Sequence, residues 1–77
     1  MLLSEAISPK DYIIESVNTG DDELDAFLFS LGCYSGETIT VLSKRYSGCI
    51  VVIKDARYNI DHQLARLIKV RALDKNM

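Results

Sequence analysis

The sequence predicts a mainly β domain of the α+β class: a small barrel of about five short strands with one main helix inserted after the first strand. The chain has 77 residues, enough for one domain with a single modest core. Several short runs are rich in β-branched and aromatic residues, and one longer segment has a helical apolar period. Closing the sheet would protect the edges of so short a domain. Residues 1–77 are therefore expected to be a single domain, with residues 74–77 frayed.

The first strand is expected at residues 12–17 (YIIESV), after a turn at residues 8–11. Pro9 fixes its own backbone dihedral and disfavours helix in the residue before it. The run that follows is β-branched and aromatic, as is typical of a strand. Ile13 and Ile14 are adjacent and break the alternation, which predicts a bulge or two partly buried faces.

The main helix is expected within the segment NTGDDELDAFLFSLG. Thr19 and Asp22 have the spacing of a capping box, and the acidic residues that follow lie at the positive end of the helix dipole. Gly32 is placed where a left-handed C-terminal cap belongs. The predicted apolar stripe consists of residues at helical spacing, namely Leu24, Phe27, Leu28 and Leu31.

The second half of the chain predicts a β-hairpin, a further strand, a helical turn and a closing strand. The hairpin has strands at residues 38–43 and 49–55, the latter covered on both sides, joined by residues 44–48. A short strand at residues 56–60 and a helical turn capped by Asp61 are expected next. A last strand is expected at residues 67–73, with Ile68 and Val70 on the opposite parity to Leu67 and Lys69.

Composition excludes several classes of function. The formal net charge is -2 and the nine basic residues are spread along the chain, which argues against nucleic-acid binding. No apolar run approaches the ~20 residues of a membrane-spanning helix, and the N-terminus is unlike a signal peptide. A cytoplasmic protein without direct membrane insertion is therefore expected. The two cysteines are too few for a secreted disulfide framework and are expected to be reduced and buried.

The segment GCYSGET, residues 32–38, has glycines and a hydroxyl spaced somewhat like those of a phosphate-binding loop. Such a loop needs a Lys where this sequence has Glu37, and it joins a strand to a helix rather than a helix to a strand. A helix-capping Gly32 followed by a turn at Gly36 explains the segment instead.

No metal site or catalytic set is predicted. Cys33 and Cys49 are not part of paired-ligand motifs, so Cys33 and His62 are only weak candidates for binding Fe2+ or another divalent transition metal. The acidic cluster near Asp21 is explained as a solvated helix start. His62 has no nucleophile in a recognisable motif, so the protein is not expected to be an enzyme or to hold a cofactor.

The segment Lys44-Arg45-Tyr46 is the most prominent exposed feature of the sequence. A basic pair beside an aromatic residue, at the expected tip of the hairpin, can contact nucleic acid or a protein partner. A single such tip on a net-acidic chain more often contacts protein, or nothing. The exposed flank of the main helix, residues 22–31, is the second candidate for such a contact.

Nearly the whole chain resembles the ferrous iron transport protein A (FeoA) family. The resemblance rests on FSLGCYSGETITVL, then the apolar strand CIVVIKD, then ARYNIDHQLARLIKV. The opening LSEAISPKDYIIESV is also similar. Two positions depart from the family pattern: Cys33 replaces an aliphatic residue, which supports its role as a hydrophobe, and Lys10 follows Pro9 where the family often has Gly.

The resemblance implies an SH3-like barrel and an accessory role in ferrous iron uptake. It implies that the partner is the cytosolic GTPase region of a FeoB-type membrane iron transporter, with no enzymatic activity and no established metal site. The alternative is a domain that binds or senses a transition metal directly, related to the C-terminal domain of metal-dependent repressors. Self-association through exposed strand edges is a further expectation.

Overall fold

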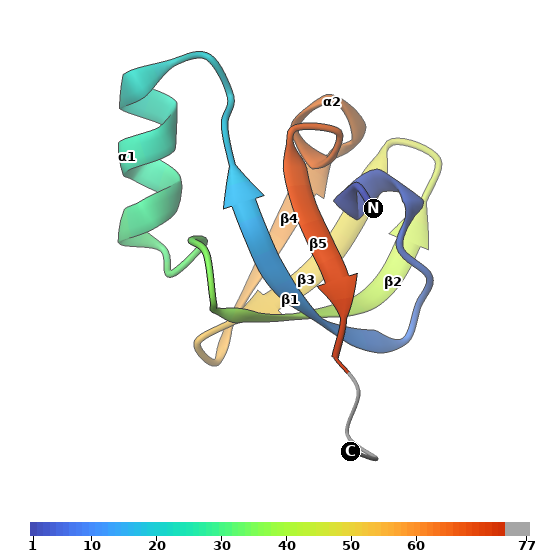
Figure 1. The fold of residues 1–77 in the computed structure, drawn as a ribbon. Helices are drawn as coiled ribbons and strands as arrows, with labels where there is room; N and C mark the ends of the chain where they lie inside the picture. The colour runs from blue at the N-terminus through green and yellow to red at the C-terminus, as the bar shows by residue number, and fades with distance from the viewer. Residues whose placement is uncertain (74–77) are drawn as a thin grey trace.

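The computed structural model describes residues 1–73; the predicted frayed tail, residues 74–77, lies outside the described part. Five strands form one antiparallel sheet in the order β4-β3-β2-β1-β5. The main helix follows the first strand, as the sequence predicts (Figure 1). The elements in chain order are the 3-10 helix η1 (Leu3–Glu5), β1 (Lys10–Val17), α1 (Asp22–Ser30), β2 (Thr38–Arg45), β3 (Gly48–Ile53), β4 (Ala56–Asp61), α2 (His62–Ala65) and β5 (Ile68–Ala72).

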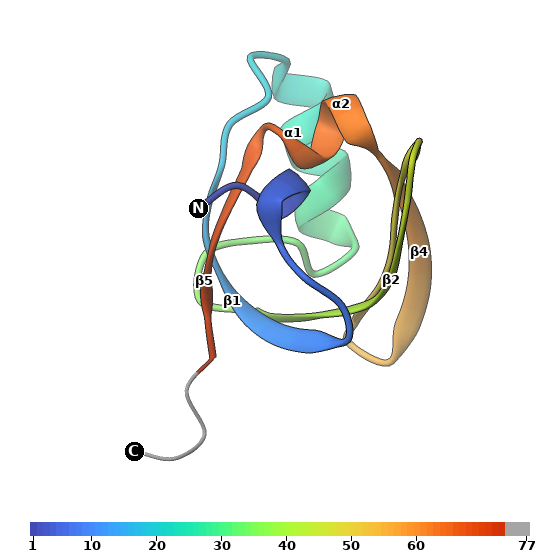
Figure 2. The same ribbon diagram turned by 90° about the vertical axis from the view of Figure 1, so that its right-hand side faces the viewer.

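The sheet is strongly curved but open, so the prediction of a closed barrel is wrong. Strands β4 and β5 form its two edges, and no strand pairing joins them within residues 1–73. The outer edge of β5 is instead occupied by the N-terminus, where Leu2 forms a β-bridge with Lys69. The pairing register shifts around Glu15 in β1 and Leu42 in β2, and such bulges bend strands. The curvature is visible in Figure 2.

Strand β1 begins two residues earlier than predicted. Lys10 and Asp11, assigned from the sequence to a turn, pair with Val41 and Thr40 of β2. The bend is confined to Ser8 and Pro9, which are joined by a cis peptide bond. Cross-strand pairing therefore extends the strand up to the proline. The predicted bulge in this strand is confirmed, although it lies after Ile14.

The hairpin link is shorter than predicted. Arg45 pairs with Gly48, so only Tyr46 and Ser47 connect β2 to β3, and the basic pair belongs to the strand. Strand β3 also ends early, at Ile53, because the next two residues have positive φ angles of 49° and 67°, as in the tight turns of β-hairpins. Only one face of β3 is fully buried, so the prediction that both faces are covered is wrong.

The core lies inside the curved sheet. Strand residues that include Ile68 and Val70 are buried there, together with Leu28 of α1. The N-terminal segment adds Leu3 and Ala6, which are also fully buried. The sequence had given residues 1–7 no structural role, yet they cover one side of the core (Figure 1).

Candidate protein-binding surface beside helix α1

Helix α1 begins with a side-chain cap that differs from the predicted one. Asp21 is the cap: its carboxylate accepts hydrogen bonds from the N–H groups of Glu23 and Leu24, at 3.0 and 3.2 Å. Thr19 instead donates from its N–H and its hydroxyl to Asp25, at 3.0 and 2.7 Å. The predicted capping box of Thr19 and Asp22 is therefore wrong. Asp21 is the residue that caps the helix, and Thr19 bonds to Asp25 instead.

The helix ends as predicted, at Gly32. The N–H of Gly32 donates to the carbonyl of Phe29 at 3.0 Å, and the N–H of Cys33 donates to that of Leu28 at 2.9 Å. These two bonds form a Schellman motif, which requires a left-handed residue, and the φ of Gly32 is +97°. The chain then turns at Gly36, with φ +92°, and enters β2. The structure thus confirms that GCYSGET is a helix stop and a turn.

The apolar stripe of α1 is narrower than predicted. Leu28 is buried and Leu24 and Leu31 are partly buried against the core, but Phe27 is 58% exposed. Phe29, on another side of the helix, is 62% exposed. Helix α1 therefore contacts the sheet through a narrow strip and leaves both phenylalanines at the surface.

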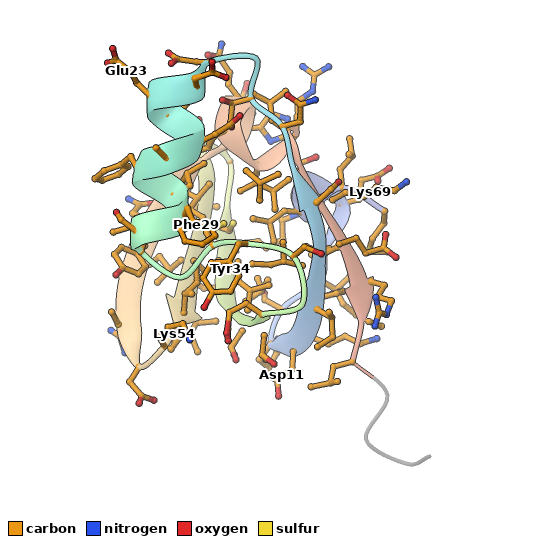
Figure 3. All side chains as sticks on the ribbon, turned by 60° about the vertical axis from the view of Figure 1, so that its left-hand side comes forward. Asp11, Glu23, Phe29, Tyr34, Lys54 and Lys69 are labelled. Carbon is orange, nitrogen blue, oxygen red and sulfur yellow. The ribbon has the colours of Figure 1, made fainter. Side chains whose placement is uncertain are left out.

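Phe29 is held in place by neighbours that are distant in sequence. Its ring stacks on that of Tyr34, with centroids 4.6 Å apart. The Lys54 ammonium lies 5.6 Å from the centre of the Tyr34 ring and 3.2 Å from a carboxylate oxygen of Glu37. Tyr34, and after it Glu37, raise the pKa of Lys54. We call Phe29, Tyr34, Lys54 and Glu37 the aromatic platform; three of these residues are labelled in Figure 3.

Two grooves flank α1, and Cys33 contributes to both. The first has a volume of about 320 Å³ and lies beside the aromatic platform, and its lining includes Glu15 and Asp25. The second has a volume of about 180 Å³ and runs between α1 and β4, with a more apolar lining that includes Phe27 and Tyr58. Both grooves are open, partly apolar clefts of the kind that accept side chains of a partner.

The two weak metal candidates differ in environment. Cys33 is 1% exposed, and burial raises the pKa of its thiol to about 11. Burial also raises the pKa of the Cys49 thiol, against a smaller lowering effect of Lys44. His62 lies at the surface at the start of α2. No group of three or more His, Cys, Asp or Glu side chains placed to hold a metal occurs in residues 1–73.

The predicted contact segment is only partly free. The Lys44 ammonium donates to the carbonyl of Ser4 at 2.6 Å and so ties β2 to η1. Arg45 is exposed, and Tyr46 is fully exposed at the turn. This turn lies far from α1, on the other side of the molecule (Figure 1). The aromatic platform was not among the predicted contacts, although Phe29 and Tyr34 flank the helix stop in the sequence.

The charged residues are segregated along the chain. The seven acidic residues between positions 11 and 43 have no basic residue among them, whereas seven of the nine basic residues lie between Lys44 and Arg71. The start of α1 is therefore strongly acidic.

A five-stranded antiparallel sheet with one flanking helix and a surface of ordered aromatic residues defines a small SH3-like domain. Residues 1–72 match the family model of the FeoA domain, and the chain belongs to the FeoA family. Within residues 1–73, no helix is long and apolar enough to cross a membrane.

Solved structures agree with this assignment. A crystal structure described as the iron uptake regulatory protein FeoA is 30% identical; the match covers 95% of this chain and 97% of that one, with a TM-score of 0.84. FeoA from Stenotrophomonas maltophilia, described as an SH3 domain protein and complexed with zinc, is 24% identical over 92% of this chain and 89% of that one, with a TM-score of 0.80.

A manganese-dependent transcriptional repressor shares the fold at 19% identity and a TM-score of 0.83. The match covers 95% of this chain but only 41% of the repressor. Among curated protein sequences, none matches the chain significantly.

Proposed function

We propose that this domain is a protein-binding module of ferrous iron uptake that acts in the cytoplasm on the cytosolic GTPase region of a FeoB-type transporter. Membership of the FeoA family supports the link to iron transport. The observation that carries the binding role is the aromatic platform, where the 62% exposed Phe29 is stacked on Tyr34 beside an open groove. Aromatic residues that are already ordered lose little entropy on binding and are frequent hot spots.

The partner surface is expected to pair an apolar side chain with a basic one. The apolar side chain would pack on Phe29 in the adjoining groove, and the basic one would face Asp25 and Glu15, which also line that groove. Charges at the rim mainly affect the rate of association and its dependence on salt. Arg45 and Tyr46, on the other side of the molecule, remain a second proposed contact.

The proposal is tested by measuring binding of this chain to the transporter's cytosolic region by biolayer interferometry, with and without guanine nucleotide. Phe29→Ser should weaken binding by about thirtyfold, the effect of losing a hot spot. Phe27→Ser is the matched control, since it removes an equally exposed aromatic ring from the same helix. Absence of binding over a broad range of salt, or equal effects of both variants, would contradict the proposal.

Direct binding of a transition metal is the second candidate. It is supported by the zinc complex of the Stenotrophomonas protein and by the fold shared with the manganese-dependent repressor. In this chain the described residues contribute only scattered ligands, with Cys33 buried and His62 exposed. Anaerobic calorimetry with Fe(II), Zn(II) and Mn(II) tests this function, and the absence of binding heat with all three metals would end it.

A further inference from the structure

The outer edge of β4 has backbone groups that no other part of the described chain uses. Strand β4 pairs only with β3. Ile53 and Ala56 pair across the two-residue turn between β3 and β4. Starting with the residue after Ala56, every second residue of β4 directs its N–H and C=O groups away from β3. These residues are Arg57, Asn59 and Asp61, whose side chains are also exposed. Asp61 is the N-cap of α2, so its carbonyl also accepts the first hydrogen bond of that helix. An edge of this kind is a template for a further strand.

We propose that this edge pairs with the β4 edge of a second copy of the same chain, antiparallel and centred on Asn59. A two-fold pairing centred on Arg57 would place two arginines opposite each other, and one centred on Asp61 would oppose two aspartates. Centring on Asn59 places Arg57 of each copy opposite Asp61 of the other, twice. Opposite charges in directly facing positions stabilise a pair of strands, whereas like charges destabilise it.

In the same register, the side chains on the other face of β4 also match between the two copies. Tyr58 of each copy would lie opposite Ile60 of the other, and pairs of an aromatic with a β-branched residue stabilise antiparallel strands. Tyr58, Asn59 and Ile60 also line the groove beneath α1, where Phe27 is 58% exposed. A second copy at this edge would therefore cover apolar surface as well as complete the hydrogen bonds of the sheet.

The two charged side chains are available for this contact. Neither Arg57 nor Asp61 forms an ion pair with another residue of the described chain. Asp61 accepts one hydrogen bond, from the N–H of Leu64 to Oδ1 at 2.7 Å, which leaves Oδ2 for an arginine. One pair of six-residue strands buries less than the roughly 1,200 Å² of a standard interface, so the association should be reversible and depend on concentration.

Charge reversal tests the register by sedimentation equilibrium of the full chain up to about 1 mM. The unmodified chain should dimerise, and Arg57→Glu or Asp61→Lys should each raise the dissociation constant by about tenfold or more. An equimolar mixture of the two variants should recover dimers, because each heterodimer regains two opposite-charge pairs. A chain that stays monomeric at all concentrations, or variants that do not complement each other, would overturn the proposal. Circular dichroism checks that each variant folds.

A cysteine at the two-fold axis gives an independent test. Facing residues of a hydrogen-bonded antiparallel pair have Cα atoms about 5.5 Å apart, a distance compatible with a disulfide. Asn59→Cys should thus form a covalent dimer under mild oxidation, whereas Lys69→Cys, on the opposite edge strand, should not. Equal cross-linking of the two variants would overturn the proposal. So would a monomeric chain in which Arg57→Glu weakens binding to the transporter region, since the edge would then receive a partner's strand.

Discussion

The two edges of the sheet are treated differently by the same chain. At β5, the N-terminal ammonium donates to the carbonyl of Val70 at 3.0 Å, and the N–H of Val70 donates to the carbonyl of Met1 at 2.8 Å. At β4, nothing in the described chain covers the backbone of Arg57 and Asn59. One edge is thus closed by residues almost seventy positions away, and the other is left available for association. An edge can therefore be open or protected for reasons that its own sequence does not contain.

The largest expected effect comes from detaching the open edge. A Cβ atom at Gly48 would collide with the backbone carbonyl of Ile60 and approach the Cα of Asp61 to 2.8 Å. Because both obstacles are backbone, Gly48→Val should separate β3 from β4 and lower the free energy of unfolding by about 4 kcal/mol or more. Urea denaturation followed by circular dichroism measures this. A loss below 1 kcal/mol would show that β4 can shift without cost.

Uncovering the closed edge should have the next largest effect. Leu3, the first residue of η1, is fully buried, and truncating a buried leucine typically costs about 2–5 kcal/mol. Leu3→Ala should therefore destabilise the domain by about 3 kcal/mol and increase hydrogen exchange at Val70 by loosening the N-terminal segment. Ile7→Ala is the control, since Ile7 is 62% exposed in the same segment. Unchanged exchange at Val70 would show that the cover is independent of the core.

Local sequence patterns predicted most of the secondary structure. Five strands, the main helix, its glycine stop and the Asp61 cap of α2 all follow from alternation, helical spacing or capping chemistry within a few residues. The errors arose where long-range contacts decide. Lys10 and Asp11 belong to a strand because they pair with β2. The sheet is open where a closed barrel was expected, and the N-terminal segment pairs with the outer edge of β5 instead of β4.

The candidate surface was less predictable for the same reason. The sequence indicated that the helix flank is exposed, but helical spacing alone placed Phe27 in the core, where the structure does not. The partners that order Phe29 come from the turn after the helix and from the distant β3–β4 turn. No local pattern brings Tyr34 and Lys54 together. The hairpin segment was identified by its composition, yet one of its residues, Lys44, holds η1 instead of facing a partner.

Replacing Gly32, which ends helix α1, should disturb the groove between α1 and β4 while leaving the pairing of β3 with β4 intact. A Cβ atom at Gly32 would lie 2.8 Å from the side chain of Lys54 and 3.1 Å from that of Ile53, at a φ of +97°. Backbone strain and overpacking together should make Gly32→Val less stable by about 3 kcal/mol. Gly36→Val is the control, because its φ is equally positive but a Cβ would meet open space. Equal losses in both variants would assign the whole effect to backbone strain.

Cys33 gives the smallest effect at neutral pH and a larger one in alkali. The valine side chain is similar in size, so Cys33→Val should change stability at pH 7 by less than about 1.5 kcal/mol. Burial raises the pKa of this thiol from 9.0 to about 11, so the folded state favours the protonated form. Stability is then retained below pH 9 and lost as the pH rises from 9 to 11, by up to about 2.7 kcal/mol for two pKa units.

The variant lacks this titration, and the loss between pH 9 and 11 should be correspondingly smaller in Cys33→Val. Urea denaturation of both proteins at pH 7, 9 and 10.5 measures the difference, because the two chains are identical at every other position. Parallel curves would mean that the thiolate of Cys33 is solvated in the folded state. In that case the base of both grooves beside α1 would be open to water, and the apolar cleft next to the β4 edge would be a weaker site for any partner.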